Sequence, residues 1–167
     1  MKQLWAPWRL SYLQGENHKL DGCVFCDKQA AEDSVEHILY RGSHSYITLN
    51  RYPYSNGHLM IVPYQHTGFV EDLSDVTLFE VMQLLKHVLR ILRETYNPQG
   101  FNVGVNEGSA GGAGIAEHVH FHVVPRWDGD SNYITIIGET RVIPQSLEDT
   151  FNCLRPLFDH LIQQTAH

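Results

Sequence analysis

The sequence has few cysteines, no excess of positive charge and no long apolar run. Three cysteines among 167 residues are too few for a disulfide framework. Lys and Arg number 12 against 19 Asp and Glu, a net charge of −7, which argues against broad nucleic-acid binding. No apolar run reaches the roughly 18 residues of a transmembrane helix, and residues 1–12 lack the apolar core of a secretory signal. We therefore expect a cytoplasmic protein that binds neither nucleic acid nor a membrane.

The length and composition indicate one globular domain over residues 1–167. A chain of this length buries about two-thirds of its unfolded surface, and its 43% hydrophobic content is ordinary. Residues 1–22 lack periodicity, and the segment Trp5-Ala6-Pro7-Trp8-Arg9 is interpreted as an aromatic arm that docks on the domain.

Apolar periodicity predicts strands and two long helices. We expect strands at 37–40, 45–49, 58–62, 101–106, 118–124 and 133–142. Ser74 is the expected N-cap of a helix over 75–96, with a core stripe of Leu78, Val81, Met82, Leu85, Leu89 and Leu92. A second helix follows Ser146, with Asp149 completing the cap and Leu147, Phe151, Leu154, Phe158 and Leu161 on its buried face. Cys153 is expected to be a small buried side chain in that helix.

The most unusual stretch alternates histidines with apolar residues, from His118 to Val124. A period of two predicts a strand with Val119, Phe121 and Val123 in the core and three histidines on the other face. Such a row fits an accidental polar face, a metal site, or a nucleophilic imidazole whose neighbours fix its tautomer. The stretch by itself leaves these three open.

Two other motifs could carry chemistry. Cys23-Val24-Phe25-Cys26 could be half of a zinc site, a redox pair or two inert thiols, although no thioredoxin-like context surrounds it. Residues 107–117 hold four glycines beside the histidine stretch, which suits close approach of backbone to a phosphate chain.

Taken together, these motifs resemble the histidine triad (HIT) superfamily, whose signature alternates three histidines with apolar residues. The match is complete from His118 to Val124, and the resemblance also covers Asn50 to Val62, Gly57-His58, and the Cys-x-x-Cys. The aromatic arm and residues 124–132 resemble the bacterial branch of diadenosine tetraphosphate phosphorylases and hydrolases. The resemblance implies an α+β fold with a mostly antiparallel five-stranded sheet, two main helices and a homodimer.

The resemblance also implies that dinucleoside polyphosphates are cleaved through a covalent nucleotidyl-histidine. His120 would be the nucleophile, His122 would contact the phosphate, and His58 would order the triad by hydrogen bonds. Asn50 would bind the ribose or set the site. Asn106 and the amides of the glycine loop, including Gly114, would contact the phosphate region. The acceptor could be water or inorganic phosphate.

The resemblance further implies a structural zinc ion held by Cys23, Cys26, His66 and His118, and no organic cofactor. One departure is that residues 114–117, Gly-Ile-Ala-Glu, lack the Gln-Ser or Gln-Thr that many relatives carry before the triad. This weakens the case for a nucleoside phosphoramidase. Other interpretations are a non-catalytic, zinc-scaffolded nucleotide-binding module, or a redox metal bound to the triad itself.

Overall fold

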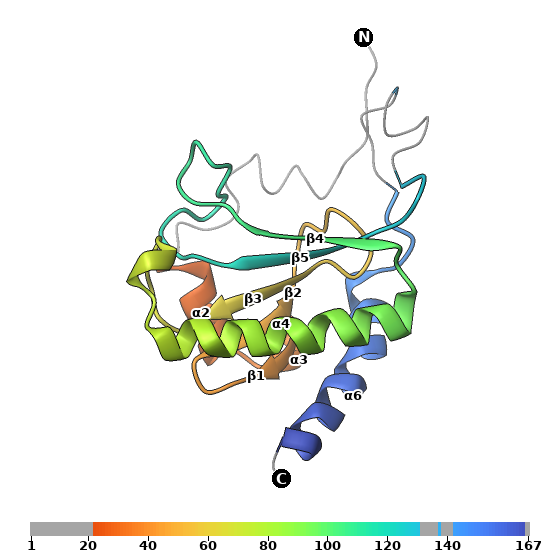
Figure 1. Cartoon of the computed structure of the whole chain (residues 1–167), viewed down its shortest axis with the longest axis horizontal. Coiled ribbons are helices and arrows are strands. Elements are labelled where there is room, and N and C mark those ends of the chain that lie inside the picture. The colour runs from red at the N-terminus through yellow and green to blue at the C-terminus, as the bar shows by residue number, and fades with distance from the viewer. Residues whose placement is uncertain (1–21, 131–136, 138–141, 166–167) are drawn as a thin grey trace.

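The computed structural model describes residues 22–130, 137 and 142–165, which form an α+β fold around one five-stranded antiparallel sheet (Figure 1). The strand order is β1-β2-β3-β5-β4. The strands are β1 (Ile38–Arg41), β2 (Ser45–Leu49), β3 (Leu59–Pro63), β4 (Gly100–Val105) and β5 (Phe121–Arg126). The helices are α2 (Val24–Ala30), α3 (Asp33–Glu36), the 3-10 turn η1 (Val70–Asp72), α4 (Asp75–Tyr96) and α6 (Leu147–Thr165).

Local capping explains the bounds of α4, which match the prediction. The Ser74 side chain accepts a hydrogen bond from the Thr77 amide at the N-terminus. Asn97 ends the helix with φ of 46°, a left-handed conformation that Asn tolerates better than most residues. The predicted cap of α6 is also confirmed, since Ser146 Oγ accepts from the Asp149 amide at 3.0 Å and donates to its carboxylate at 2.6 Å.

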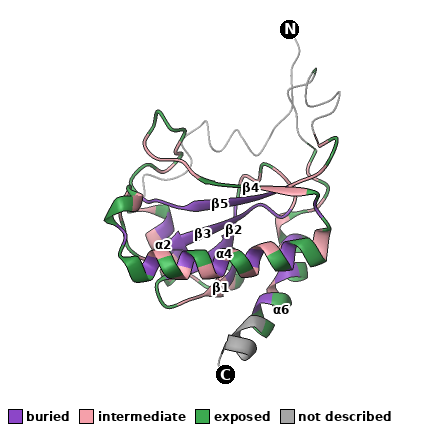
Figure 2. Ribbon diagram, viewed as in Figure 1, coloured by how far each residue is buried: buried purple, intermediate pink, exposed green. Residues whose placement is uncertain are grey.

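The sheet is covered on both faces. On one face α4 and α6 close the main core, whose buried members include Ile47, Ile61, Val123 and Leu154. On the other, Phe25 of α2 packs with Tyr46, Met60 and Val62. Because both faces are covered, β3 and β5 are buried along nearly their whole length (Figure 2). None of the described helices is long and apolar enough to cross a membrane.

The buried stripe of α4 differs from the prediction. The buried positions include Val81, Leu84, Val88 and Leu92, whereas Met82 is 46% exposed. Leu78, Leu85 and Leu89 pack at the edge of this core. Apolar residues lie on more than one side of this helix, so periodicity could not fix which side faces the sheet.

The histidine strand begins later than predicted. β5 starts at Phe121, so His118 and His120 precede it. The pairing of Ile61 with Phe121 would place Val119 opposite Pro63, which has no N–H to offer. The Val119 amide donates instead to the carbonyl of Thr67 at 2.7 Å. The histidines are also not exposed, because His118, His120 and His122 are at most 8% accessible.

Cys153 was predicted to be buried but is exposed on α6, whose inner side presents Leu154 and Phe158 instead. Leu147 and Phe151 pack against this core as partly buried side chains. The aromatic arm up to residue 21 lies outside the described residues, as does almost all of the strand expected over 133–142.

Candidate functional site

His58 and His122 form a buried hydrogen-bonded pair at the centre of the sheet. Gly57, with φ of 70°, leads into His58; a Cβ there would lie 3.0 Å from the Tyr96 ring. The amide of Tyr54 donates to His58 Nδ1 at 3.0 Å, so the proton of His58 is on Nε2. Nε2 lies 3.0 Å from His122 Nδ1 and donates to it. His122 therefore carries its own proton on Nε2.

His120 is fixed in the opposite tautomer. Its Nδ1 lies 2.9 Å from the carbonyl oxygen of His118 and must donate to it. Nε2 then keeps its lone pair, as a nucleophile requires. The Phe25 ring packs on His120 with ring centroids 4.7 Å apart, and His122 meets His120 edge to face at 4.8 Å.

Burial keeps these imidazoles neutral. Burial, followed by the charges of His122 and His120, lowers the pKa of His58 to about 3. Burial and the charge of His120 lower the pKa of His122 to about 4. Burial lowers the pKa of His120 as well, although its hydrogen bond to the His118 carbonyl opposes the shift. All three rings are therefore uncharged at neutral pH.

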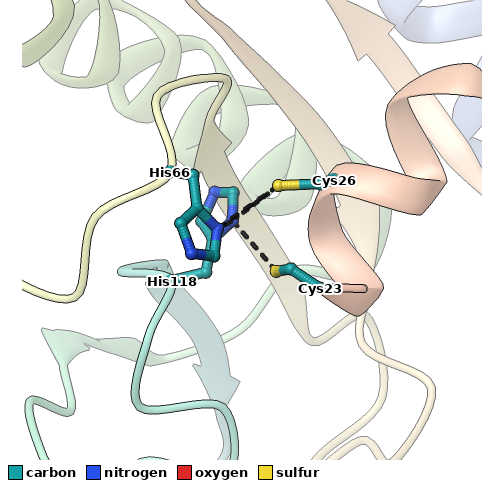
Figure 3. A group of neighbouring side chains, drawn as sticks. All are labelled: Cys23, Cys26, His66 and His118. Atoms are coloured by element: carbon teal, nitrogen blue, oxygen red, sulfur yellow. Dashed lines mark hydrogen bonds between the residues drawn. The ribbon is translucent and has the colours of Figure 1, made fainter. Parts of the chain in front are cut away.

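Four predicted ligand residues converge from three separate segments (Figure 3). Cys23 and Cys26 come from the start of α2, His66 from the loop after β3, and His118 from the segment before β5. One ligand atom from each lies within 4.8 Å of the others. His118 Nδ1 is 3.2 Å from Cys23 Sγ and 3.5 Å from Cys26 Sγ, and His66 Nδ1 is 3.3 Å from both Cys26 Sγ and His118 Nδ1.

This cluster has the geometry and chemistry of a closed metal site. A tetrahedral zinc ion with two sulfur and two nitrogen ligands would separate them by about 3.4 to 3.8 Å, close to the observed spacings. His118 Nε2 donates to the Pro63 carbonyl at 2.9 Å, which leaves Nδ1 unprotonated and directed at the sulfurs. The residues therefore could bind a metal. Because His118 serves this cluster while His120 and His122 make other bonds, the three histidines do not converge on one ion.

The three residues expected to bind the nucleotide differ in how far they can reach a ligand. Asn50 is 9% exposed and already engaged, since its Oδ1 accepts from the Tyr52 amide and its Nδ2 lies 3.4 Å from the His58 ring. Asn106 lines a cleft that opens over His122, and its Nδ2 lies 3.4 Å from the Gly112 carbonyl. Gly114 is exposed in the loop and does not line the cleft.

A cleft of about 540 Å³ opens over His122, bounded by the β2–β3 loop and by β4 and β5. Its lining includes Tyr54, Asn102, Asn106, His122 and Arg126. Sequence reasoning did not assign a function to Phe25, Tyr54, Asn102 or Arg126. Of these four, only Phe25 could have been connected to the site from the sequence, because it lies between the two cysteines of the Cys-x-x-Cys motif.

The fold and this histidine arrangement are those of the HIT family, and the HIT domain matches residues 31–129. The chain is 42% identical over 157 residues to an AP-4-A phosphorylase of Mycobacterium tuberculosis, covering 90% of this chain and 80% of that protein. It is 31% identical over 99 residues to a yeast bis(5'-adenosyl)-triphosphatase, covering 56% of this chain and 45% of that protein. A Zn-bound histidine triad family protein from Mycobacterium smegmatis superposes with a TM-score of 0.68 at 26% identity, covering 86% and 98% of the two chains. This chain therefore belongs to the HIT family.

Proposed function

We propose that this protein cleaves dinucleoside polyphosphates of the diadenosine tetraphosphate type through a nucleotidyl-His120 intermediate. The observation that carries the proposal is the pair of opposite tautomers: a free lone pair on His120 Nε2 beside an N–H on His122 Nε2. A nucleophile and a donor side by side suit attack on a phosphate. The M. tuberculosis and yeast relatives, named for such substrates, support the same reaction class.

In the first step, His120 Nε2 attacks the phosphorus of one nucleotide and forms an N–P bond. The P–O bond to the remaining nucleoside polyphosphate breaks, and its electron pair stays on the leaving oxygen. The His122 Nε2–H donates a hydrogen bond to the developing negative charge. The nucleotidylated ring of His120 becomes positive, and the His118 carbonyl, 2.9 Å from Nδ1, stabilises that charge.

In the second step, an acceptor oxygen attacks the phosphorus and the N–P bond breaks. The electron pair returns to His120 Nε2, and the acceptor's proton is lost to solvent. Inorganic phosphate as acceptor would give a nucleoside diphosphate, and water would give a monophosphate. The name of the 42% identical relative favours phosphate.

Zinc is the metal we propose for the Cys23, Cys26, His66 and His118 cluster, because two thiolates and two imidazoles are its usual structural ligands. It would hold α2, and with it Phe25, against the histidines. The zinc-bound M. smegmatis protein supports this choice.

We also propose a homodimer formed through β4. Among the described strands none pairs with the outer edge of β4, and Val103 there is 45% exposed. Arg93 of α4 lies over the Phe101 ring at 5.2 Å, so this side of the helix adjoins β4. Met82 lies on the same side, three helical turns earlier, and is 46% exposed. A second copy would cover both surfaces.

Product analysis on diadenosine tetraphosphate, with and without inorganic phosphate, tests the proposal. ADP plus ATP that appears only with phosphate identifies a phosphorylase, whereas AMP plus ATP in both conditions identifies a hydrolase. His120→Asn should reduce turnover by at least roughly a thousandfold while nucleotide binding and the fold persist. Nucleotide binding without any cleavage by the wild type would instead identify a binding module.

A further inference from the structure

The cleft continues well beyond the reacting histidines. His122, Val124 and Arg126 alternate along one face of β5, and the register places Gly104 opposite His122 and Asn102 opposite Val124. Four residues of strand span about 13 Å. The cleft therefore has a reactive end at His122 and a far end at Asn102 and Arg126, which the reaction steps above do not use.

Arg126 is held rigidly at this far end. Its Nε and Nη2 donate to the two carboxylate oxygens of Asp130 at 2.5 and 2.8 Å, and Nη1 donates to Asn102 Oδ1 at 2.6 Å. The Arg126 side chain is the more accessible of the two, at 36% exposed against 18% for Asp130. Three of five N–H donors are engaged by described residues, which leaves two N–H groups for a ligand.

Asn102 adds to this supply of donors. Because its Oδ1 accepts from Arg126, its amide nitrogen offers two further N–H groups at the same place. Val124 is level with Asn102, and Gly104 is level with His122; neither contributes a polar side-chain atom to the cleft between Arg126 and His122. Among the described lining residues, the cleft therefore has polar side chains at both ends and none between them. This fits an extended ligand that presents hydrogen-bond acceptors to the far end of the cleft.

We propose that Asn102 and Arg126 form a subsite for the far part of the leaving nucleoside polyphosphate, its distal phosphate or ribose oxygens. This inference rests on the proposed function. The Arg126 guanidinium is hydrogen-bonded to Asn102, which pairs with Val124 in the sheet. The guanidinium therefore lies about 7 to 13 Å along the strand from His122. The second-step acceptor must touch the phosphorus on His120, so a group this distant contacts the leaving arm rather than the acceptor.

A purely structural role for Arg126 makes a different prediction. The Asp130 carboxylate also accepts from the Trp127 amide at 3.3 Å, so the ion pair fastens the turn after β5. If the ion pair only stabilises this turn, its loss would lower the stability of the protein and reduce kcat/KM equally for all substrates. Loss of a leaving-group contact would impair only substrates that carry the second nucleotide.

Two substrates that share the nucleotide placed on His120 separate these roles. Diadenosine tetraphosphate carries the full leaving arm, and the p-nitrophenyl ester of AMP replaces it with a small phenolate. We would measure kcat/KM of both with the full-length wild type, Arg126→Gln and Asn102→Ala. Arg155→Gln is the matched control, because Arg155 binds the carboxylates of Asp33 and Asp159 outside the cleft.

Because a hydrogen bond to a charged group is strong, Arg126→Gln should lower kcat/KM for diadenosine tetraphosphate about tenfold to a hundredfold. Asn102→Ala should lower it in the same direction, and both should keep the ester within twofold of wild type. An equal loss on both substrates, or no loss on either, would overturn the subsite while wild-type turnover upholds the proposed function. If the wild type cleaves neither substrate, the proposed function itself fails and the subsite with it.

Discussion

Acidification should destabilise this protein through its buried histidines. An unfolded histidine takes up a proton near pH 6.5, whereas His58 and His122 in the folded chain stay neutral down to pKa values of about 3 and 4. Between these limits the unfolded state binds more protons, so the free energy of unfolding falls as the pH falls. From pH 7.5 to pH 5.0, each histidine should remove about 2 kcal/mol, about 4 kcal/mol for the pair.

The assay is urea unfolding followed by circular dichroism at pH 7.5 and 5.0. Other groups in the protein also take up protons on acidification, so the informative quantity is the difference between the wild type and His58→Gln. The variant should lose about 2 kcal/mol less than the wild type over this range. His44→Gln, whose side chain is exposed, should follow the wild type. An identical loss in the wild type and His58→Gln would refute the reasoning that His58 is held neutral by the fold.

Three further predictions use matched variants. Cys26→Ser should lose the proposed zinc ion, measured by elemental analysis, and melt at a lower temperature, whereas Cys153→Ser, on the exposed side of α6, should keep the wild-type zinc content and melting temperature. Val103→Lys should shift the protein toward monomer in sedimentation, whereas Val142→Lys, at a 71% exposed position, should leave the dimer intact; dimeric Val103→Lys would count against the β4 interface. Leu154→Ala should cost about 2 to 5 kcal/mol in urea unfolding, and Leu157→Ala, at 37% exposure, much less; similar costs would contradict the packing of α6.

The sequence correctly predicted the helix ends that are set by local capping residues. The bounds of α4 follow from the Ser74 cap and from the left-handed Asn97, which act on their own helix termini whatever the rest of the chain does. The Ser146–Asp149 cap of α6 is similar. Where the result depends on a neighbouring surface, prediction was less accurate. Met82 and Cys153 were assigned to the core, although the sheet contacts other sides of their helices.

For the site, the sequence supplied the residue types and the family resemblance, and the fold supplied the chemistry. The triad spacing and the Cys-x-x-Cys identified the ligand and nucleophile candidates, but nothing local brings Cys23, Cys26 and His66 to His118. Only the tertiary structure sets the tautomers, because the Tyr54 amide and the His118 carbonyl decide which nitrogen of each ring keeps its lone pair. Likewise Arg126 is an ordinary residue in the sequence. The strand register, which pairs segments distant along the chain, places it with Asn102 at the far end of the cleft.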